Sequence, residues 1–449
     1  SSRRRSSQVG LCGRQFSARL DLGAGLQTAR RRIERDRDRL DLDALRRRLD
    51  PRRVRDATLG RLADAPHVDD AHVADGAIEG DVAHAADDDV AAVVAEQGVD
   101  LFFGLIEAER FGRIERRAVH EHEGSAVLER DAMMGGEALE ALKVVTPGDD
   151  DAVVALNTAL MQDGVVIRVA PGAKVERPLA ILNLMSGGFA QATFLRSILI
   201  VGAGASVMLD EATAVCAPDA TQANEGLTIL VGDGARVDYA AQLAEQSAES
   251  VALHSLFVTM GADATFNAFC LTPCAGLVRR QIFARLNGER STISLAGLSL
   301  LRGKQHADTT LVVDHAVPNC VSREFFRHIL DHEATGVFQG KVVVRQHAQK
   351  TDGAMKSQAL VLGDDASMNN KPELEIFADD VVCGHGATVG QLDDDQIFYL
   401  RARGLSKPEA ESLLLEAFAG EALDMVTDEA LRERYAAITQ DWLSRRGEA

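Results

Sequence analysis

A thiol and an imidazole stand two residues apart near the C-terminus, at Cys383 and His385. They lie in a run with strand character, residues 377–390, that stops just before a helix-like segment. Residues i and i+2 of a β-strand point to the same face, so we expect the sulfur and the nitrogen side by side. Such a pair suits a soft metal ion or sulfur chemistry. The spacing alone is weak, because both residue types are also common in protein interiors, and a bulge at Gly384 would separate them.

Other histidines and cysteines form looser groups. Cys270 and Cys274 are four positions apart, but no second pair follows at zinc-finger spacing, so we expect no structural zinc site. A second group lies further along the chain, and its apolar neighbours favour packing in the core for several members: His315, Cys320, His328 and His332. Cys320 is kept from this group as a further candidate ligand.

Length and charge bound the class of protein. A chain of 449 residues with 46% hydrophobic residues is expected to form two or three domains. The net charge of −19 argues against binding to nucleic acid or to an anionic membrane surface. No apolar run approaches the roughly 20 residues that span a bilayer. Six cysteines spread over the chain form no disulfide framework. We therefore expect a soluble, cytoplasmic protein.

The first 130 or so residues differ from the rest. They contain no lysine, tyrosine or tryptophan, yet they are rich in arginine and in runs of Asp, Ala, His and Val. Low hydrophobicity with high charge indicates disorder or loosely formed helix. We therefore assign residues 1–150 to a poorly defined N-terminal region. One hypothesis is that residues 1–130 are partly a mistranslated reading frame of GC-rich DNA, and peptides from this region in the native protein would exclude it.

A repeated turn indicates the fold of the middle of the chain. A small turn motif followed by an apolar residue begins at Gly172, Gly204, Gly234 and Asp263, at offsets of 32, 30 and 29 residues. Short apolar strands lie between these turns, and helical periodicity is missing. A near-constant period of strands and tight turns predicts a β-solenoid over residues 151–390. An antiparallel sandwich with regular hairpins is the alternative.

After Gln391 the pattern becomes helical. Three aspartates at 393–395 favour a helix start, and Gly404 is placed to end that helix near Arg403. A capping box with proline in the first turn then predicts a second helix from Ser406. The last helix carries one apolar stripe, which usually packs on its own domain: Leu431, Tyr435, Ile438 and Trp442. Residues 391–449 are thus predicted to form a C-terminal helical domain.

Several motifs of catalysis are missing from the sequence. It contains no Gly-x-x-x-x-Gly-Lys-Ser/Thr motif, no Gly-x-Ser-x-Gly elbow, and no Gly-x-Gly-x-x-Gly between a strand and a helix. The chain is therefore expected to be neither an ATPase nor an enzyme of those classes. Any energy input has to come from a partner.

A string of ordered motifs resembles the SufB/SufD family of iron–sulfur cluster assembly scaffolds, and within it the D-type subunit. The motifs are residues 155–160, 163–166, 169–173, 349–352 and 372–376, together with 377–390 and 396–404. The resemblance covers roughly residues 134–449. It implies a right-handed parallel β-helix flanked by N-terminal and C-terminal helical regions. Ser357 stands where the B-type paralogue carries a sulfur-accepting cysteine, which favours the D type, because a serine forms no persulfide.

The resemblance also implies a function. The chain would be a non-catalytic SufD scaffold subunit that pairs with SufB and docks two copies of the ATPase SufC. A transient iron–sulfur cluster would form at the SufB interface, with no cofactor permanently bound. His385 matches the interfacial histidine of the family, while Cys383 and Cys320 rank below it. The C-terminal helices would dock SufC, with these candidate contacts: Leu413, Phe418, Tyr435 and Trp442.

Two alternatives from other classes remain open. A β-helix enzyme that cleaves acidic polysaccharide would need acidic or basic residues along one face of the solenoid, and normally a secretion signal. A purely structural adaptor would tolerate the loss of His385.

Overall fold

The computed structural model describes residues 91–97, 126–129, 151–161, 163–185, 191–215, 221–243, 248–273 and 276–446. Two nine-stranded sheets run through this part of the chain. Of the predicted N-terminal region, only the strands β1 (Ala91–Gln97) and β2 (Ala126–Glu129) are described. The predictions of disorder and of a mistranslated reading frame lie outside the described residues.

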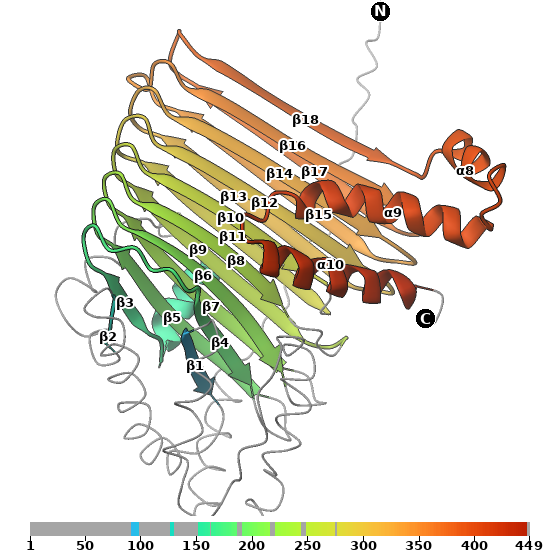
Figure 1. Cartoon of the computed structure of the whole chain (residues 1–449), viewed down its shortest axis with the longest axis horizontal. Helices are drawn as coiled ribbons and strands as arrows, with labels where there is room; N and C mark the ends of the chain where they lie inside the picture. The colour runs from blue at the N-terminus through green and yellow to red at the C-terminus, as the bar shows by residue number, and fades with distance from the viewer. Residues whose placement is uncertain are drawn as a thin grey trace, which may run out of the picture. The chain divides into compact units, whose positions relative to one another are not determined.

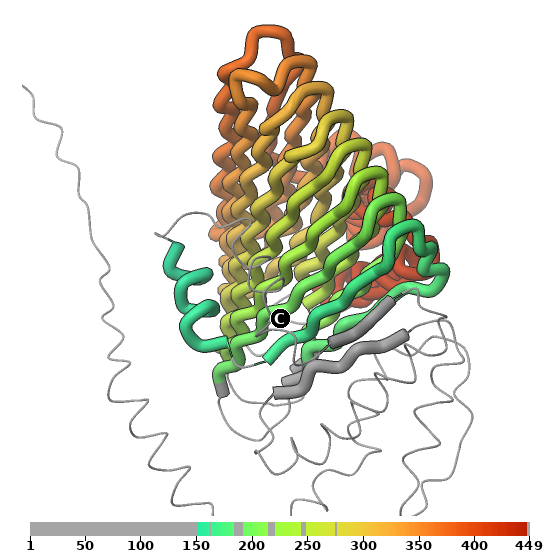
Figure 2. Tube along the Cα trace, turned by 90° about the vertical axis from the view of Figure 1, so that its left-hand side faces the viewer, coloured from blue at the N-terminus to red at the C-terminus, as the bar shows by residue number. Residues whose placement is uncertain are grey.

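The strands alternate between the two sheets along the chain. One sheet, here sheet A, has the order β1-β4-β6-β8-β10-β12-β14-β16-β18, and the other, sheet B, has the order β17-β15-β13-β11-β9-β7-β5-β3-β2. In the described part of the chain, every strand pairing is parallel except the one between β2 and β3. Each coil therefore adds one strand to each sheet, and the coils stack as Figure 2 shows. The predicted parallel β-solenoid is confirmed, and the antiparallel sandwich is excluded.

Sheet A is built from these further strands: β4 (Leu179–Met185), β6 (Ser206–Val215), β8 (Arg236–Leu243), β10 (Thr265–Thr272), β12 (Thr292–Leu301), β14 (Val321–Leu330), β16 (Asp352–Val361) and β18 (Val382–Gly390). Sheet B is built from β3 (Val166–Val169), β5 (Gln191–Val201), β7 (Thr221–Val231), β9 (Val251–Met260), β11 (Leu277–Leu286), β13 (His306–His315), β15 (Thr335–Val344) and β17 (Ser367–Ile376). In Figure 1, β18 lies at the upper edge of the stack, far from β4.

The repeated turns occupy the left-handed region of backbone space. Gly172, Gly204 and Gly234 have φ of 73°, 68° and 64°, and Asp263 has a φ of 55° in the next turn. Each turn also donates a backbone hydrogen bond to the next coil, as the Gly204 amide does to the Asp233 carbonyl at 2.7 Å. Glycine is favoured there because it adopts positive φ without steric cost. The sequence period therefore reflects a real conformational requirement.

The space between the two sheets holds the main core. Alternate residues of strands such as β7, β8 and β9 point inward, so apolar side chains of successive coils stack in columns, for example Val207 on Val237 and Leu227 on Leu256. The columns include large buried side chains such as Phe266 and Phe338. A single coil could not bury its apolar face on its own, so the stack of coils is needed to form this continuous core.

One helix lies at the start of the region predicted to form the β-solenoid core. Helix α7 (Ala152–Leu160) begins at Asp151, whose carboxylate accepts from the amides of Val153 and Val154 at 3.0 Å. Buried Asn157 donates to the carbonyl of Leu195 at 2.9 Å and to that of Asn224 at 2.8 Å. The amide thereby ties α7 to two neighbouring strands of sheet B.

Three helices follow the last strand: α8 (Asp394–Arg401), α9 (Lys407–Leu423) and α10 (Glu429–Ser444). Asp393 caps α8, and the capping box of Ser406 and Glu409 starts α9, both as predicted. Helices α9 and α10 cover the outer face of sheet A (Figure 1), where they bury Phe269, Leu298 and Tyr435 in a second core. None of the helices in the described part of the chain has the length and apolarity needed to cross a bilayer.

Candidate functional site at the open end of the solenoid

The solenoid ends in two strands that each lack a neighbour on one side. Within the described residues, β18 pairs only with β16, and β17 pairs only with β15. Their free edges carry unpaired backbone amides and carbonyls at the same end of the stack. We call β17 and β18 together the open end. Long exposed edges of this kind are templates for pairing with another chain.

His385 lies in β18 and its side chain is exposed. It is in register with Met355 of β16, which points into the core and is 3% exposed. Since paired residues of parallel strands share a face, the imidazole caps the interior column at the open end. The predicted ligand is therefore accessible to a partner that covers this end.

Cys383 shares the face of His385, as the sequence predicted, and β18 is regular between them. Its thiol packs against the main core and is half-buried. It is in register with Gly353, where an added Cβ would lie 3.5 Å from the Cys383 sulfur and 3.4 Å from the Ser322 hydroxyl. Burial raises the pKa of the Cys383 thiol, and the nearby Asp352 and Glu324 raise it further. The thiol is therefore held mainly in its protonated form until a cation or partner changes its surroundings.

A groove of ≈ 530 Å³ runs along the open end. Its lining includes Met368 and Asn370 of β17 with Ala387 and Val389 of β18. Ile376 of β17, Phe377 just after it and Val382 of β18 are also exposed, by 40%, 58% and 74%. The open end thus combines unpaired backbone with apolar side chains, which is the composition of a surface that another protein covers.

Cys320 is not part of this surface. Its side chain has no exposed area, and its thiol lies 3.4 Å from the Gly288 carbonyl and 3.3 Å from the Ser291 hydroxyl. It immediately precedes β14, two strands of sheet A below β18. The structure therefore brings Cys383 and His385 together but places Cys320 inside the core.

The four candidate docking residues of the C-terminal helices divide by exposure. Leu413 is 46% exposed, and Phe418 is partly buried beneath Arg327, whose guanidinium lies 4.2 Å from its ring centroid. Tyr435 and Trp442 are 0% and 1% exposed. While α10 stays packed on sheet A, these two side chains stabilise the helix rather than contact a partner.

Two exposed aromatic residues were missed by the sequence analysis. Phe398 and Tyr399 of α8 are 73% and 55% exposed, and the guanidinium of Arg403 lies 4.4 Å from the Tyr399 ring centroid. Both are in the motif 396–404 that carried the resemblance. The signal for these two residues was the short amphipathic pattern of α8, in which only Ile397 is buried.

Residues 183–418 match the SufBD core domain of the SUF system for FeS cluster assembly, and residues 140–181 match the N-terminal region of SufBD proteins. The core match covers more than half of the chain. The chain belongs to the SufBD family. Both matches fall on the part that forms the solenoid, helix α7 and most of α9.

Several curated proteins are similar to the chain, and two of the three described here are named for iron–sulfur cluster assembly. The chain is 39% identical over 175 residues to the iron-sulfur cluster assembly protein SufD of Escherichia coli K12, an alignment of 39% of this chain and 41% of the relative. It is 31% identical over 290 residues to a SufBD family protein of Synechocystis sp. PCC 6803, with 62% and 63% covered. It is 28% identical over 283 residues to the chloroplastic protein ABCI7 of Arabidopsis thaliana, with 61% and 59% covered. The chain thus spans about two fifths to three fifths of these relatives.

Proposed function

We propose that the chain is a non-catalytic, D-type scaffold subunit for iron–sulfur cluster assembly in the cytoplasm. It pairs with a SufB-type paralogue through the open end and docks the ATPase SufC through its C-terminal helices. A cluster forms transiently at the paralogue interface. The observation that carries the proposal is the exposed imidazole of His385 on the terminal strand of a SufBD solenoid.

The ligand role of His385 follows from its chemistry and its place. A scaffold has to hold iron and sulfide and then release them. Imidazole binds iron less tightly than thiolate does in such clusters, which suits transient binding. Cys383 is the secondary ligand, because burial raises the pKa of its thiol and the thiol therefore loses its proton less readily than that of a free cysteine. His385 therefore makes the primary contact, and Cys383 joins when iron replaces the proton on sulfur.

Pairing with a paralogue follows from the free edge of β18. A second SufBD solenoid has an equivalent terminal strand, and two such strands satisfy each other's backbone groups when they pair. The apolar side chains at 40–74% exposure would be buried in the same contact. Formation of this interface would bring ligands of both subunits around one cluster.

Docking of the ATPase is assigned to α8 and the exposed face of α9. These carry Phe398, Tyr399 and Leu413, whose exposed fractions range from 46% to 73%. Aromatic and aliphatic side chains at such exposure are typical anchors of protein interfaces. Movements of a docked ATPase would act on α9, which is bound to sheet A through Arg327, Phe418 and Glu421.

The proposal is tested with the chain in complex with its SufB-type and SufC-type partners. His385→Ala is expected to leave the complex intact and to reduce the iron and sulfide recovered after anaerobic reconstitution at least tenfold. His347→Ala is the matched control, because His347 is also an exposed histidine but lies outside the open end. Normal iron and sulfide in the His385→Ala complex would leave a structural adaptor as the remaining function.

A further inference from the structure

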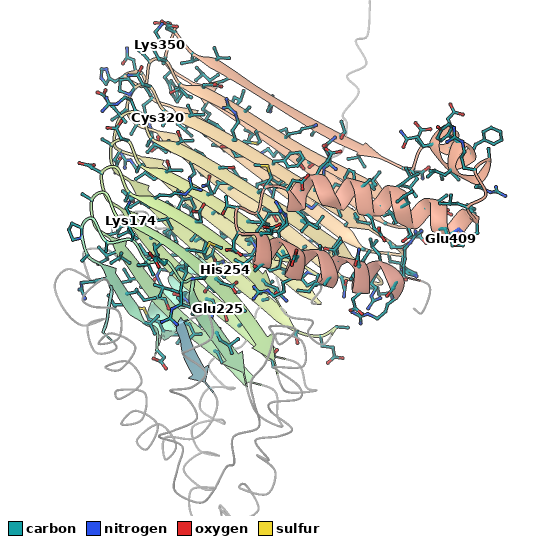
Figure 3. All side chains as sticks on the ribbon, viewed as in Figure 1. Lys174, Glu225, His254, Cys320, Lys350 and Glu409 are labelled. Carbon is teal, nitrogen blue, oxygen red and sulfur yellow. The ribbon has the colours of Figure 1, made fainter. Side chains whose placement is uncertain are left out.

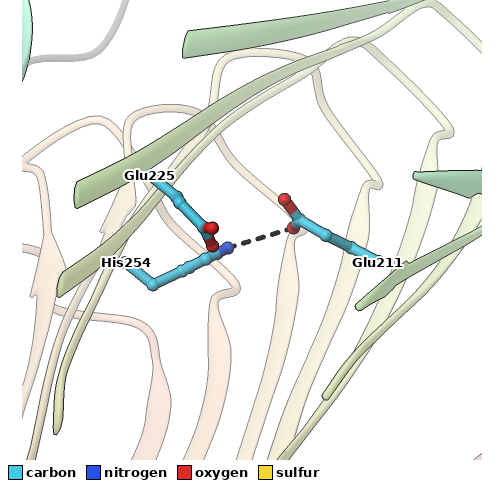
Figure 4. A group of neighbouring side chains, drawn as sticks. All are labelled: Glu211, Glu225 and His254. Carbon is cyan, nitrogen blue, oxygen red and sulfur yellow. Dashed lines mark hydrogen bonds and ion pairs between the residues drawn. The ribbon is translucent and has the colours of Figure 1, made fainter. Parts of the chain in front are cut away.

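A second group of ligand-type side chains lies inside the solenoid, away from the open end. Glu211 of β6, Glu225 of β7 and His254 of β9 each point one ligand atom into a common space, and these atoms lie within 4.8 Å of one another (Figure 4). All three side chains are buried, with exposed fractions of 4%, 2% and 3%. In Figure 3, Glu225 and His254 lie low in the stack, several strands from β18. No pattern in the sequence marks them, because they come from three separate strands.

Neighbouring donors hold one oxygen of each carboxylate, and the second oxygen of Glu211 also accepts from Tyr239 and lies beside Nε2 of His254. The Asn183 amide donates to Oε1 of Glu211 at 3.2 Å, and the Thr213 hydroxyl donates to Oε2 of Glu225 at 2.6 Å. Oε1 of Glu225 has no hydrogen-bond partner although it is buried. A buried carboxyl oxygen without a partner is costly and calls for an unseen one. Outer donors that fix one carboxylate oxygen are also what metal sites use to orient their ligands.

The distances suit ligands of one small cation. Oε2 of Glu211 and Nε2 of His254 are 3.0 Å apart. Two adjacent ligands of an octahedral ion, each about 2.1 Å from it, are separated by about 3.0 Å. The hydroxyl of Tyr239 lies 2.5 Å from the same Glu211 oxygen and 3.4 Å from the same nitrogen. Oxygen and nitrogen atoms of the three proposed ligands and of Tyr239 therefore line the common space.

We propose that Glu211, Glu225 and His254 bind one divalent first-row metal ion of the Mn²⁺ or Fe²⁺ type. Two carboxylates and one imidazole form a hard-to-intermediate ligand set that these ions accept, and one that soft ions such as Cu⁺ do not prefer. The site is separate from the proposed cluster ligands, so it goes beyond the scaffold function and does not depend on it.

Binding of an ion at this group changes where Glu225 and His254 hold their protons. Burial and the charge of Glu211 raise the pKa of Glu225 to about 8, so at neutral pH this carboxyl holds a proton that an ion has to displace. Arg280 lies 3.4 Å from Nδ1 of His254, which places the ring proton on Nε2, where it is donated to Glu211. Metal binding moves that proton to Nδ1 and opens the long Arg280 contact. One proton, from Glu225, is released per ion bound.

Other charged and titratable groups surround Glu225. Glu211 and His254 are the other ligands, Tyr239 donates to Glu211, and Arg280 supplies a positive charge. Burial and the Glu211 charge hold the pKa of Tyr239 well above its ordinary value, and nearby anionic groups hold that of Arg280 above its own, so both keep their protons.

The test is a titration of the purified full chain with MnCl₂ at pH 7.5, with free Mn²⁺ measured by electron paramagnetic resonance. Because the ligands are buried, the ion enters by local opening, and each point is followed until it is constant. We expect one Mn²⁺ site per chain in the wild type. An absence of any such site in the wild type would overturn the proposal.

Glu225→Gln is the informative variant, because it replaces an already neutral carboxyl by a neutral amide of the same shape. It should lose the site, with at least a thirtyfold weaker affinity. Glu324→Gln is the matched control: Glu324 is also 1% exposed and has a pKa raised to about 8, but it lies outside the group. Equal Mn²⁺ binding by the wild type and Glu225→Gln would contradict the proposal, and circular dichroism confirms that both are folded.

Discussion

At the residue scale, the open end is connected to a buried carboxyl through one interior column. His385, Met355 and Glu324 occupy the same register position on β18, β16 and β14. Glu324 is 1% exposed, and neither of its carboxyl oxygens has a hydrogen-bond partner. Burial raises its pKa from 4.5 to about 8. Two strands below the proposed ligands, β14 therefore holds a carboxyl that is neutral at physiological pH.

The raised pKa of Glu324 predicts how the folding stability depends on pH. Between about pH 4.5 and 8 the folded protein keeps a proton on Glu324 that the unfolded chain has released, so stability falls as the pH rises through this window. In Glu324→Gln this contribution is absent. Its free energy of unfolding should decline less steeply, by about 1.4 kcal/mol per pH unit at most.

Denaturant titrations of the wild type and Glu324→Gln at pH 5.5, 6.5 and 7.5 measure this difference. Glu225, whose pKa is also raised to about 8, contributes equally to both proteins and cancels. Parallel stability curves for the two proteins would show that Glu324 is ionised in the folded state.

Residue types and spacing predicted Cys383 and His385 as a pair on one face, because the side-chain period of a strand is fixed. The spacing of residues could not predict whether Cys320 is buried or exposed, because burial depends on which coils lie above it. Glu324 and the Glu211, Glu225 and His254 group gave no signal at all. Some of the residues that contact them are about 30 or more positions away in the sequence. Only the register of the coils brings these side chains together.

At the scale of single elements, the direction of the β18 amides decides how the edge can pair. The amide of Val382 donates to the Thr351 carbonyl on the β16 side. Since amides alternate in direction along a strand, those of Thr388 and other even-numbered residues also face β16. The amides of Ala387 and other odd-numbered residues face outward, where a paralogue strand would accept them.

Two neighbouring proline substitutions separate pairing from folding. Ala387→Pro removes an outward amide and should weaken binding of the SufB-type partner at least tenfold, while the melting temperature changes little. Thr388→Pro removes a hydrogen bond within sheet A and should lower the melting temperature instead. Calorimetric titration and thermal melts measure the two effects. Unchanged partner affinity in Ala387→Pro would place the interface elsewhere.

The elements themselves were predictable to different degrees. Turns at Gly172, Gly204 and Gly234 were readable from sequence because each requires a left-handed residue. The caps of α8 and α9 were readable because Asp393 and Ser406 satisfy backbone amides locally. Helix α7 was missed: it buries only Val154 and Asn157, so it shows no apolar stripe, and its place is fixed by hydrogen bonds to distant strands.

At the scale of the whole solenoid, α9 and α10 are secured to sheet A by charged as well as apolar contacts. Arg434 of α10 binds Asp210 of β6 at 2.7 Å, and Arg446 binds Asp331 at 2.8 Å. Asp210 is buried, so removal of Arg434 would leave an unpaired charge in the contact. The helices are therefore fixed to the solenoid, and their free face is available for a partner.

This arrangement predicts where SufC binding is sensitive. Leu413→Asp should weaken SufC binding at least tenfold, because it places a charge in an apolar contact, while leaving the fold intact. Leu277→Asp is the control, since Leu277 is a leucine of β11 with a similar exposed fraction, 40% against 46%. Pull-down and calorimetry with the purified ATPase compare the two. Equal loss in both variants, or in neither, would remove α9 from the docking surface.

The central claim is that the His385 imidazole binds the nascent cluster. In the reconstituted complex, the reduced cluster should show a hyperfine coupling to nitrogen that changes when histidine is labelled with ¹⁵N. His385→Cys should retain iron and sulfide, because thiolate replaces imidazole, but should lose that coupling. A coupling that persists unchanged in His385→Cys would contradict the account.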